Sequence, residues 1–322
     1  MPSPSRMWSR ILLPVGAFAL AFLSGCRGAD HAELVLDRGV PYAPVAPATS
    51  RRKLPRDGAY AVEFKFRSFD NEALSAVFEI NKSTYDAEDE GWGYRDSDIA
   101  GLRSWRDAAR QEAYEAASMR HDTQEKLDSD LTMLQEVYRR KFKEYFTARG
   151  FIVEPGGVTK VNLAGLARRS APKLSGLARE LEKSAKGRGR EWLIAAATSL
   201  VQTAVDYKEV PPLVDSVHTG GVWTPAKTLV GGWGDCDTKV ALLAAIMANW
   251  PGFKMIIIEL PDHFLLGYER PPANGESYIA YNGDKYVLIE AAGPAWLPPG
   301  YLGDDTKLLF ESGRGYVIDP LF

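Results

Sequence analysis

Apolar and polar positions alternate with different periods along the 322-residue chain, and each period predicts an element. From 60 to 66, large apolar residues occupy every second position, as in a half-buried strand, and 75–80 is a candidate partner strand. From 127 to 145, apolar residues recur at steps of three and four, which predicts a long amphipathic helix ending near Gly150. The alanine-rich stretch 102–119 predicts a separate helix before it.

The remaining stretches before residue 236 differ in character. The acidic, glycine-bearing stretch 86–98 predicts a loop. Residues 151–163 predict a short strand with a Gly-Gly turn, followed by two helical segments broken around Pro172. The run 190–207 lacks glycine and proline and predicts a buried helix. The long stretch 208–235 then looks mostly irregular, and so long a structureless loop in a compact domain is usually functional.

That irregular stretch leads into Cys236, which lies just before the apolar run VALLAAIM (240–247). Glycines before it allow a sharp turn, and Asp235 or Asp237 can cap the helix that the apolar run predicts. The sequence therefore places Cys236 in the first turn of a helix, where N–H groups and the helix dipole favour a thiolate. The flanking carboxylates oppose this effect, so a general base is also required.

The strands after this helix supply the base. A hairpin is predicted with strands at 255–260 and 263–269, and a third strand ends at Glu290 before a Gly-Pro turn. Covalent thiol chemistry requires a nucleophile, a base and a group that orients the base. We therefore expect Cys236 to attack, His263 to take and return the proton, and Glu290 to fix the imidazole tautomer.

The N-terminus indicates the compartment. Two arginines precede an almost wholly apolar run at 11–23, which is the layout of a secretory signal and too short for a membrane-spanning helix. The run ends in Leu-Ser-Gly-Cys26, which resembles the lipobox of bacterial lipoproteins. The resemblance implies cleavage before Cys26, its acylation and, because Arg27 follows, an outer-membrane anchor facing the periplasm. The alternatives are an ordinary signal peptide, or an uncleaved anchor, with a cysteine nearby by chance.

Composition narrows the classes of function. The chain has 2 Cys and 4 His. If Cys26 carries lipid, Cys236 has no intramolecular disulfide partner, so we expect a reactive thiol, with no metal site and no cofactor. The net charge of −3 becomes more negative once the signal is removed, which argues against nucleic acid as a partner. A hydrophobic content of 45% suffices for a core of one or two domains.

The segments GDCDTKVALLAAIM, LPDHFLLGY and YVLIEAAGP resemble the transglutaminase-like superfamily, in particular its bacterial cysteine proteases. With LVQTAVDY upstream, the resemblance covers 190–295. It implies an α+β fold, with a papain-like transglutaminase core in which the cysteine helix packs on an antiparallel sheet. In that family the helix carries the nucleophile and two successive strands carry a histidine and an Asp or Glu, so these roles pass to Cys236, His263 and Glu290. Asp is the commoner acid, and Glu290 departs from that pattern.

These observations divide the chain into four parts. A signal peptide (1–25) precedes a lipidated tether (26–57), whose prolines and few large apolar residues are typical of an extended linker. A strand and long-helix region (58–150) follows. The transglutaminase-like catalytic domain is expected at 151–322.

An acyl-transfer site also needs donors for an oxyanion, and the backbone N–H of Cys236 is the first of them. The family resemblance implies a Trp or Gln side chain upstream as a second donor, and Gln202 is the candidate. The alternative is that this glutamine is a helix residue facing water. Tyr207, Trp223 and Trp233 are other candidate donors or walls of a substrate pocket.

We therefore expect an envelope-anchored thiol enzyme that acts on amide bonds of peptides or proteins, in the first place a cysteine peptidase. A protein cross-linking transamidase would use the same residues. The alternative from another class is a catalytically silent lipoprotein that serves as a binding or assembly module. Considered one at a time, the three residues also have non-catalytic interpretations. Cys236 would be a buried inert thiol, His263 a partly buried histidine and Glu290 a surface carboxylate. His218, in the irregular stretch, is a second imidazole that could pair with Cys236.

Overall fold

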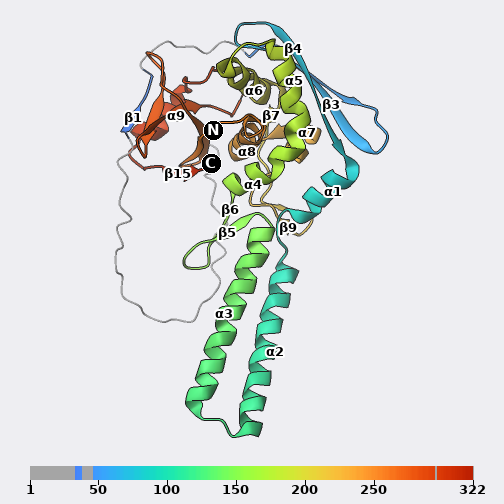
Figure 1. Cartoon of the computed structure of the whole chain (residues 1–322), viewed down its shortest axis with the longest axis vertical. Coiled ribbons are helices and arrows are strands. Elements are labelled where there is room, and N and C mark those ends of the chain that lie inside the picture. Colours follow the sequence, from blue (N-terminus) through green and yellow to red (C-terminus); the bar gives the residue numbers. More distant parts are fainter. Residues whose placement is uncertain (1–32, 38–45, 294–295, 322) are drawn as a thin grey trace, which may run out of the picture.

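The structure, a computed structural model, describes residues 33–37, 46–293 and 296–321. The expected signal peptide and the expected lipidation site Cys26 lie outside these residues. Of the helices within them, none has the length and apolar character needed to cross a membrane. Helices and antiparallel strands are mixed along the chain, which confirms the predicted α+β class (Figure 1).

The largest sheet has six strands, and every neighbouring pair in it is antiparallel. Its two faces contact two separate hydrophobic cores, because successive side chains of a strand point to opposite faces. Burial on both faces explains why the central strands have nearly continuous apolar sequences. In spatial order the strands are β1 (Glu33–Val35), β13 (Tyr278–Tyr281), β14 (Asp284–Ile289), β12 (His263–Glu269), β11 (Met255–Leu260) and β15 (Val317–Pro320).

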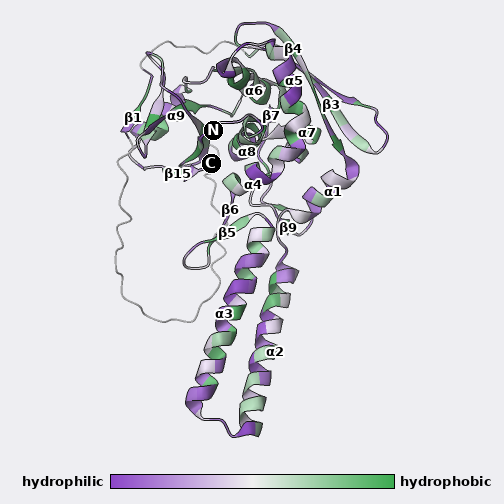
Figure 2. Ribbon diagram, in the orientation of Figure 1, coloured by the Kyte–Doolittle hydropathy of each residue, from purple (hydrophilic) through white to green (hydrophobic). Residues whose placement is uncertain are grey.

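Helix α8 (Cys236–Met247) is buried at every position and packs against β12. Its sequence is apolar on nearly all sides, as expected of a helix enclosed by others (Figure 2). The helices around it include the predicted pair broken near Pro172 and the predicted buried helix. They are α4 (Leu163–Ser170), η1 (Ala171–Leu174), α5 (Ser175–Ala185), α6 (Arg190–Ala204) and α7 (Pro225–Gly231).

A smaller antiparallel sheet covers α5 and α6. It contains β2 (Ser50–Leu54), β3 (Ala59–Arg67) and β4 (Ala73–Asn81), and the pairing of β3 with β4 confirms the two predicted strands. Phe64 and Phe78 belong to the same hydrophobic core as α8. The boundary expected at residue 150 therefore does not separate two cores.

The expectation of an extended tether through 26–57 is wrong for two segments. Strand β1 pairs with β13, and β2 pairs with β3. Just after β1, the buried Asp37 carboxylate accepts hydrogen bonds from Ser277 Oγ at 2.9 Å and Lys307 Nζ at 2.6 Å. These contacts join the N-terminal part of the described chain to its C-terminal part.

The acidic stretch 86–98 is also not the predicted loop. Helix α1 (Lys82–Gly91) runs into it, and the next helix starts at residue 96. The Glu88 carboxylate accepts from Ser170 Oγ at 2.8 Å and Lys173 Nζ at 3.0 Å, and Lys227 pairs with Asp89 at 2.7 Å. Partners far away in the sequence thus compensate the acidic charges that suggested a loop.

Helices α2 (Asp96–Arg120) and α3 (Gln124–Ala148) form an antiparallel hairpin, here called the arm, which projects from the body (Figure 1). This confirms two separate helices and the apolar stripe. At the root, Phe146 packs with Phe151 of a small hairpin, β5 (Phe151–Val153) and β6 (Thr159–Val161), whose Gly-Gly turn was predicted. His121, at the tip, is exposed, as expected.

The stretch 208–235 contains more regular structure than predicted. Besides α7, it holds the short strands β8 (Leu213–Val214), β9 (Val217–His218) and β10 (Trp233–Gly234). Strand β10 pairs in parallel with β7 (Asp206–Tyr207) at the end of α6. Helix α9 (Asp304–Glu311) lies on the face of the large sheet opposite α8. There Leu309 and Phe310 pack against the second hydrophobic core.

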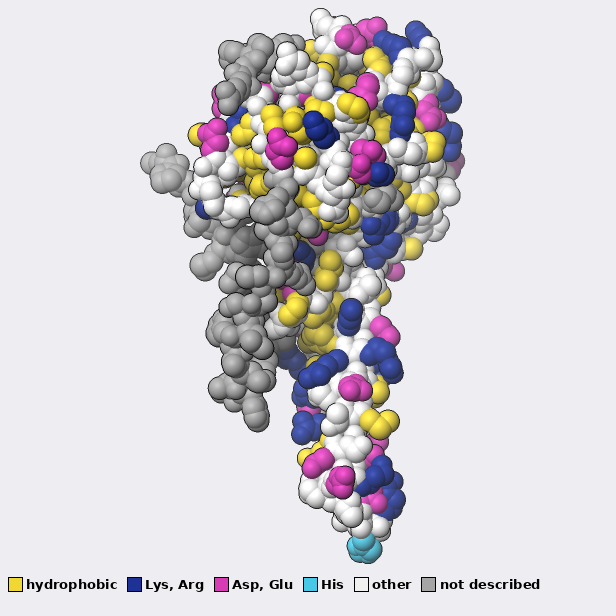
Figure 3. Space-filling view, turned by 60° about the vertical axis from the view of Figure 1, so that its left-hand side comes forward, with side chains coloured by type: hydrophobic (Ala, Val, Ile, Leu, Met, Phe, Trp, Pro, Cys, Tyr) yellow, Lys and Arg dark blue, Asp and Glu magenta, His cyan; other side chains and the backbone are white. Residues whose placement is uncertain are grey.

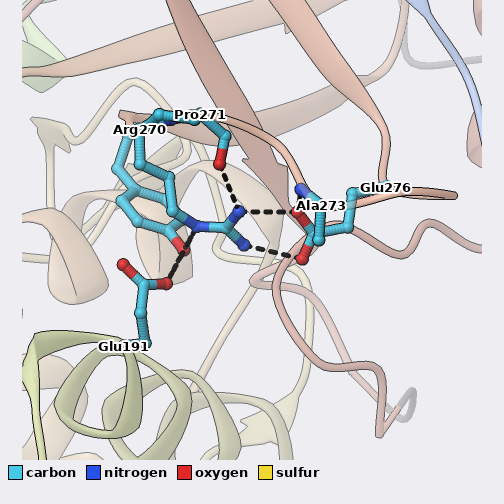
Figure 4. A network of polar contacts seen from close by, with 6 residues as sticks. Glu191, Arg270, Pro271, Ala273 and Glu276 are labelled. Atoms are coloured by element: carbon cyan, nitrogen blue, oxygen red, sulfur yellow. Dashed lines mark hydrogen bonds and ion pairs between the residues drawn. The ribbon is translucent and has the colours of Figure 1, made fainter.

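Arg270, just beyond β12, fixes the strand that begins with His263. Its guanidinium binds both carboxylate oxygens of Glu276, at 2.6 and 2.7 Å, and its Nε lies 2.8 Å from Glu191 Oε2 at the start of α6 (Figure 4). Such a bidentate pair is directional as well as strong. Together, the contacts of Arg270 with Glu276 and Glu191 link the end of β12 to the loop after it and to α6.

Candidate active site

Cys236 is the first residue of α8, as predicted. Gly232 ends α7 in the left-handed region, with φ 76°, so the chain can reverse toward the new helix. A Cβ on Gly234 would lie 2.5 Å from Thr238 Cγ2, so only glycine permits β10 to lie against the first turn of α8. The cysteine side chain is 1% exposed and belongs to the core around α8.

The two aspartates beside Cys236 have different roles. Asp235 occupies the N-cap position, but its side chain makes no capping bond; its Oδ2 accepts from the backbone N–H of Val210 at 3.0 Å. Asp237 Oδ1 accepts from the N–H of Thr238 at 2.7 Å and satisfies one donor of the first turn. Asp235 therefore fastens the loop after α6 to the site.

His263 and Glu290 lie in contact, as the sequence predicted. The ring Nε2 of His263 is 3.0 Å from Glu290 Oε1 and 3.1 Å from Oε2. His263 is the first residue of β12, after a turn in which Asp262 has φ 64°, and Glu290 directly follows β14. A carboxylate only accepts hydrogen bonds, so Nε2 carries the proton and Nδ1 is the basic ring nitrogen.

The Glu290 carboxylate is itself held in place. It is buried, Oε2 accepts from Thr306 Oγ1 of α9 at 2.7 Å, and Oε1 accepts from the backbone N–H of Ala292 at 3.3 Å. These bonds fix the direction of the carboxylate toward the imidazole. Thr306 lay outside every sequence motif and was missed.

The segment that carries Glu290 approaches the first turns of α8. Cys236 shares a hydrophobic core with Phe264 and Ala291, the residues that follow His263 and Glu290. A Cβ on Gly293 would lie 3.3 Å from Lys239 Nζ of α8 and 2.3 Å from the carbonyl oxygen of Gln202. The fold thus gathers the cysteine helix, the histidine strand and the acid segment in one region.

Lys239, one turn after Cys236, is a second residue that sequence analysis missed. Its side chain is fully buried, and its Nζ donates to the Gln202 carbonyl at 3.4 Å. Burial lowers the pKa of Lys239 to about 7, against the opposing effect of the Asp206 and Glu290 carboxylates. A lysine directly before the apolar run 240–247 was the only signal for it in the sequence.

Gln202 does not have the predicted role. It is buried rather than facing water, and its Nε2 donates to the carbonyls of Glu290 at 2.5 Å and Leu297 at 2.9 Å. Its Oε1 accepts from the Leu297 N–H at 2.9 Å. An amide has two N–H donors, and both are engaged, so none remains for an oxyanion. Gln202 instead fastens the segment after β14 to α6.

We expect Gln202→Leu to lower the free energy of unfolding by about 2 kcal/mol, because three buried backbone groups lose their partner. Urea unfolding followed by tryptophan fluorescence measures this loss. Gln111→Leu, at an exposed position on the arm, is the matched control and should change little. Unchanged stability in Gln202→Leu would contradict the fastening role.

The three aromatic candidates lie in two environments. Trp223 is buried, its backbone N–H donates to Thr238 Oγ1 at 3.3 Å, and its ring lies edge-on to that of Trp233 with centroids 5.8 Å apart. Trp233 is partly exposed beneath Lys208, whose Nζ lies 4.6 Å from the ring centroid. Tyr207 is 45% exposed and pairs with Gly234, so it lies at the surface beside the cysteine turn.

His218 has other partners than the one considered for it. Its Nε2 lies 3.1 Å from Asp96 Oδ1, and its ring stacks on Tyr94 with centroids 4.6 Å apart. Both contacts place it at the root of the arm. His218 is therefore a structural residue there, and the alternative pairing with Cys236 is wrong.

A cavity of about 450 Å³ opens beside the first turn of α8. Its wall includes Asp237, which follows Cys236, and Phe264, which follows His263. Residues of β5, β6 and the stretch 209–221, His218 among them, line most of the rest, with Lys160, Glu259 and Asp319 at one side. The cavity can hold one or two large side chains.

The chain matches no protein-family model, no curated protein and no solved structure.

Proposed function

We propose that this protein is a thiol hydrolase of amide bonds, a cysteine peptidase with a papain-like transglutaminase core, anchored in the cell envelope through Cys26. The observation that carries the proposal is the contact between His263 and a buried, fully oriented Glu290, near the helix that Cys236 begins. An imidazole directed by a carboxylate is the arrangement that activates a thiol nucleophile.

The reaction would run in two steps. Nδ1 of His263 takes the thiol proton, the Cys236 sulfur attacks the amide carbonyl, and the imidazolium then protonates the departing amine as the C–N bond breaks. Water, deprotonated by the same imidazole, attacks the thioester, and the carboxylic acid and the thiol are released. Glu290 keeps Nε2 protonated and stabilises the imidazolium in both steps.

Backbone groups supply the oxyanion donors in this proposal. Gln202 is engaged elsewhere, so the negative oxygen would lie against the N–H of Cys236 at the positive end of α8. A peptide or protein side chain would occupy the cavity beside Asp237 and Phe264. A cross-linking transamidase would use the same first step and differ in having an amine resolve the thioester.

One observation favours the alternative of a catalytically silent binding or assembly module. Cys236 is only 1% exposed, so a substrate carbonyl needs local movement to reach the sulfur. A buried inert thiol would show the same exposure. Chemical reactivity separates the two functions, because only the enzyme requires an activated thiol.

We expect iodoacetamide to alkylate Cys236 rapidly even at pH 6, where an ordinary thiol is protonated, and His263→Ala to slow this at least about tenfold. The chain should begin at Arg27, because a later start would remove β1 from the large sheet. His121→Ala is the matched control, since it removes an exposed imidazole at the tip of the arm. A slow reaction that His263→Ala does not change would support the binding module.

A further inference from the structure

The arm buries unusually little of its own apolar surface. Each helix has 25 residues, which makes the arm about 37 Å long at 1.5 Å per residue. Over both helices, which the structure describes in full, the buried side chains are Ile99, Ala117 and Phe146, and Ile99 and Phe146 belong to the root. Two helices alone leave their shared stripe half-exposed, whereas four helices enclose one.

One face of α3 has the spacing of a helix-packing seam. Its positions are separated by alternating steps of four and three residues, which keeps them on one side of the helix. We call it the α3 face: Lys126, Asp130, Met133, Val137, Arg140 and Glu144. Met133, at its centre, is 63% exposed.

Exposed aromatic surface extends this face onto α2. Lys141, one turn beyond Val137, reaches across to the ring of Trp105, with its Nζ 5.0 Å from the centroid. The contact shows that Trp105, itself 37% exposed, lies on the same side of the arm. Apolar and charged side chains are interspersed along the arm surface in Figure 3.

The order of side chains on the α3 face is complementary to its own reverse. When two copies run antiparallel about a point between Met133 and Val137, Lys126 meets Glu144, Asp130 meets Arg140, and Met133 meets Val137. Both charged pairs therefore join opposite signs, and the centre is apolar. A parallel arrangement would instead place each charge against its like.

Within a single copy, the same charges pair along the helix, and Asp130 Oδ2 also lies 3.7 Å from Arg120 Nη2 of α2. Lys126 pairs with Asp130, and Arg140 Nε lies 3.9 Å from Glu144 Oε1. Exposed pairs of this kind stabilise a helix by only a few tenths of a kcal/mol, so each charge can turn to a second partner. A two-fold axis would then place the N-terminal end of the α3 face of one copy against the C-terminal end of the α3 face of the other copy.

We infer that two copies of this chain associate through the α3 face, with their arms antiparallel in a four-helix bundle. The occupant is a second copy because the face matches itself reversed. The two bodies then lie at opposite ends of the bundle. This inference does not depend on the proposed catalytic function.

Charge reversal tests the inference in the full chain, solubilised in detergent, by sedimentation velocity across a concentration series up to about 100 μM. We expect the parent to form dimers. Asp130→Arg alone and Arg140→Glu alone should each weaken the dimer at least about tenfold, because each creates like-charge contacts twice over. The double variant should restore it, since both contacts join opposite charges again.

The double variant distinguishes association from helix stability. It carries both unfavourable changes within α3, so a purely intramolecular effect would make it the worst of the three. Met133→Glu should abolish the dimer, whereas Thr132→Glu, exposed on another side of the helix, should retain it. Circular dichroism checks that each variant keeps its helix content. A monomeric parent, or a double variant no better than the single ones, would overturn the inference.

Discussion

Cys236→Ser is expected to lower amide-bond turnover by roughly four orders of magnitude or more, the usual scale when a covalent nucleophile is replaced. An alcohol holds its proton far more tightly than a thiol, so the same imidazole cannot generate a comparable nucleophile. Serine differs from cysteine by one atom, and the site is enclosed, so the fold should persist. The loss would therefore report chemistry.

Turnover can be measured without a known substrate. The chain from Arg27 is incubated with a mixture of peptides from a bacterial envelope, and new N-termini are counted by mass spectrometry. Glu290→Gln should retain a small part of the activity, because an amide can hold the ring but cannot stabilise the imidazolium. Thr306→Val, which removes one bond to Glu290, should lie between this variant and the parent.

The outcome also separates the proposed functions. If the parent forms new isopeptide bonds when an amine is supplied, the transamidase alternative gains. If Cys236→Ser and the parent are equally inactive on every peptide, the thiol has no hydrolytic role. The thermal midpoints of parent and variant should agree within a few degrees, which shows that lost activity is not lost folding.

Elements with their own periodicity could be predicted from the sequence. The alternation in β3 and β4 and the stripe along α3 each reflect which face packs against other elements, whereas the apolar run of α8 reflects burial on all sides. Strand β1 could not be found in this way. It has three residues, and its position is fixed by partners far away in the chain. Leu34 pairs with Ile279, and Asp37 accepts a hydrogen bond from Ser277.

The candidate site likewise contains residues whose placement the sequence could predict and residues whose role it could not. His263 and Glu290 could be placed together because both lie at the ends of neighbouring strands, which bring side chains to one edge of a sheet. The role of Gln202 could not be predicted, since its partners are backbone groups of the segment around Leu297. A glutamine at the end of a helix has the same local sequence whether it binds an oxyanion or fastens a loop.

The second prediction with a large expected effect concerns Lys239, whose buried amine lowers the free energy of unfolding at neutral pH. We expect Lys239→Met to raise the free energy of unfolding by up to about 4 kcal/mol near pH 6. Methionine has a similar length and no charge, so it fills the same space within α8. Urea unfolding at a series of pH values measures the change.

The sign of the pH dependence follows from the pKa values. The pKa of Lys239 is about 7 in the folded chain, lowered first by burial, and 10.5 is its ordinary value. Between these values the unfolded chain binds the proton and the folded chain does not, so the stability of the parent rises with pH. Below about 7 both states are protonated and the full penalty remains. The gain from Lys239→Met should therefore be largest in acid and vanish above pH 10.5.

Lys239→Arg is the matched control, because guanidinium stays charged throughout and should destabilise the fold at every pH. A constant difference between Lys239→Met and the parent from pH 6 to 11 would contradict the shifted pKa. If Lys239→Met is more stable but its Cys236 is alkylated more slowly, then Lys239 lowers the stability of the fold and raises the reactivity of the thiol. The ammonium acts on the Glu290 carboxylate, and removing it would change the group that orients His263.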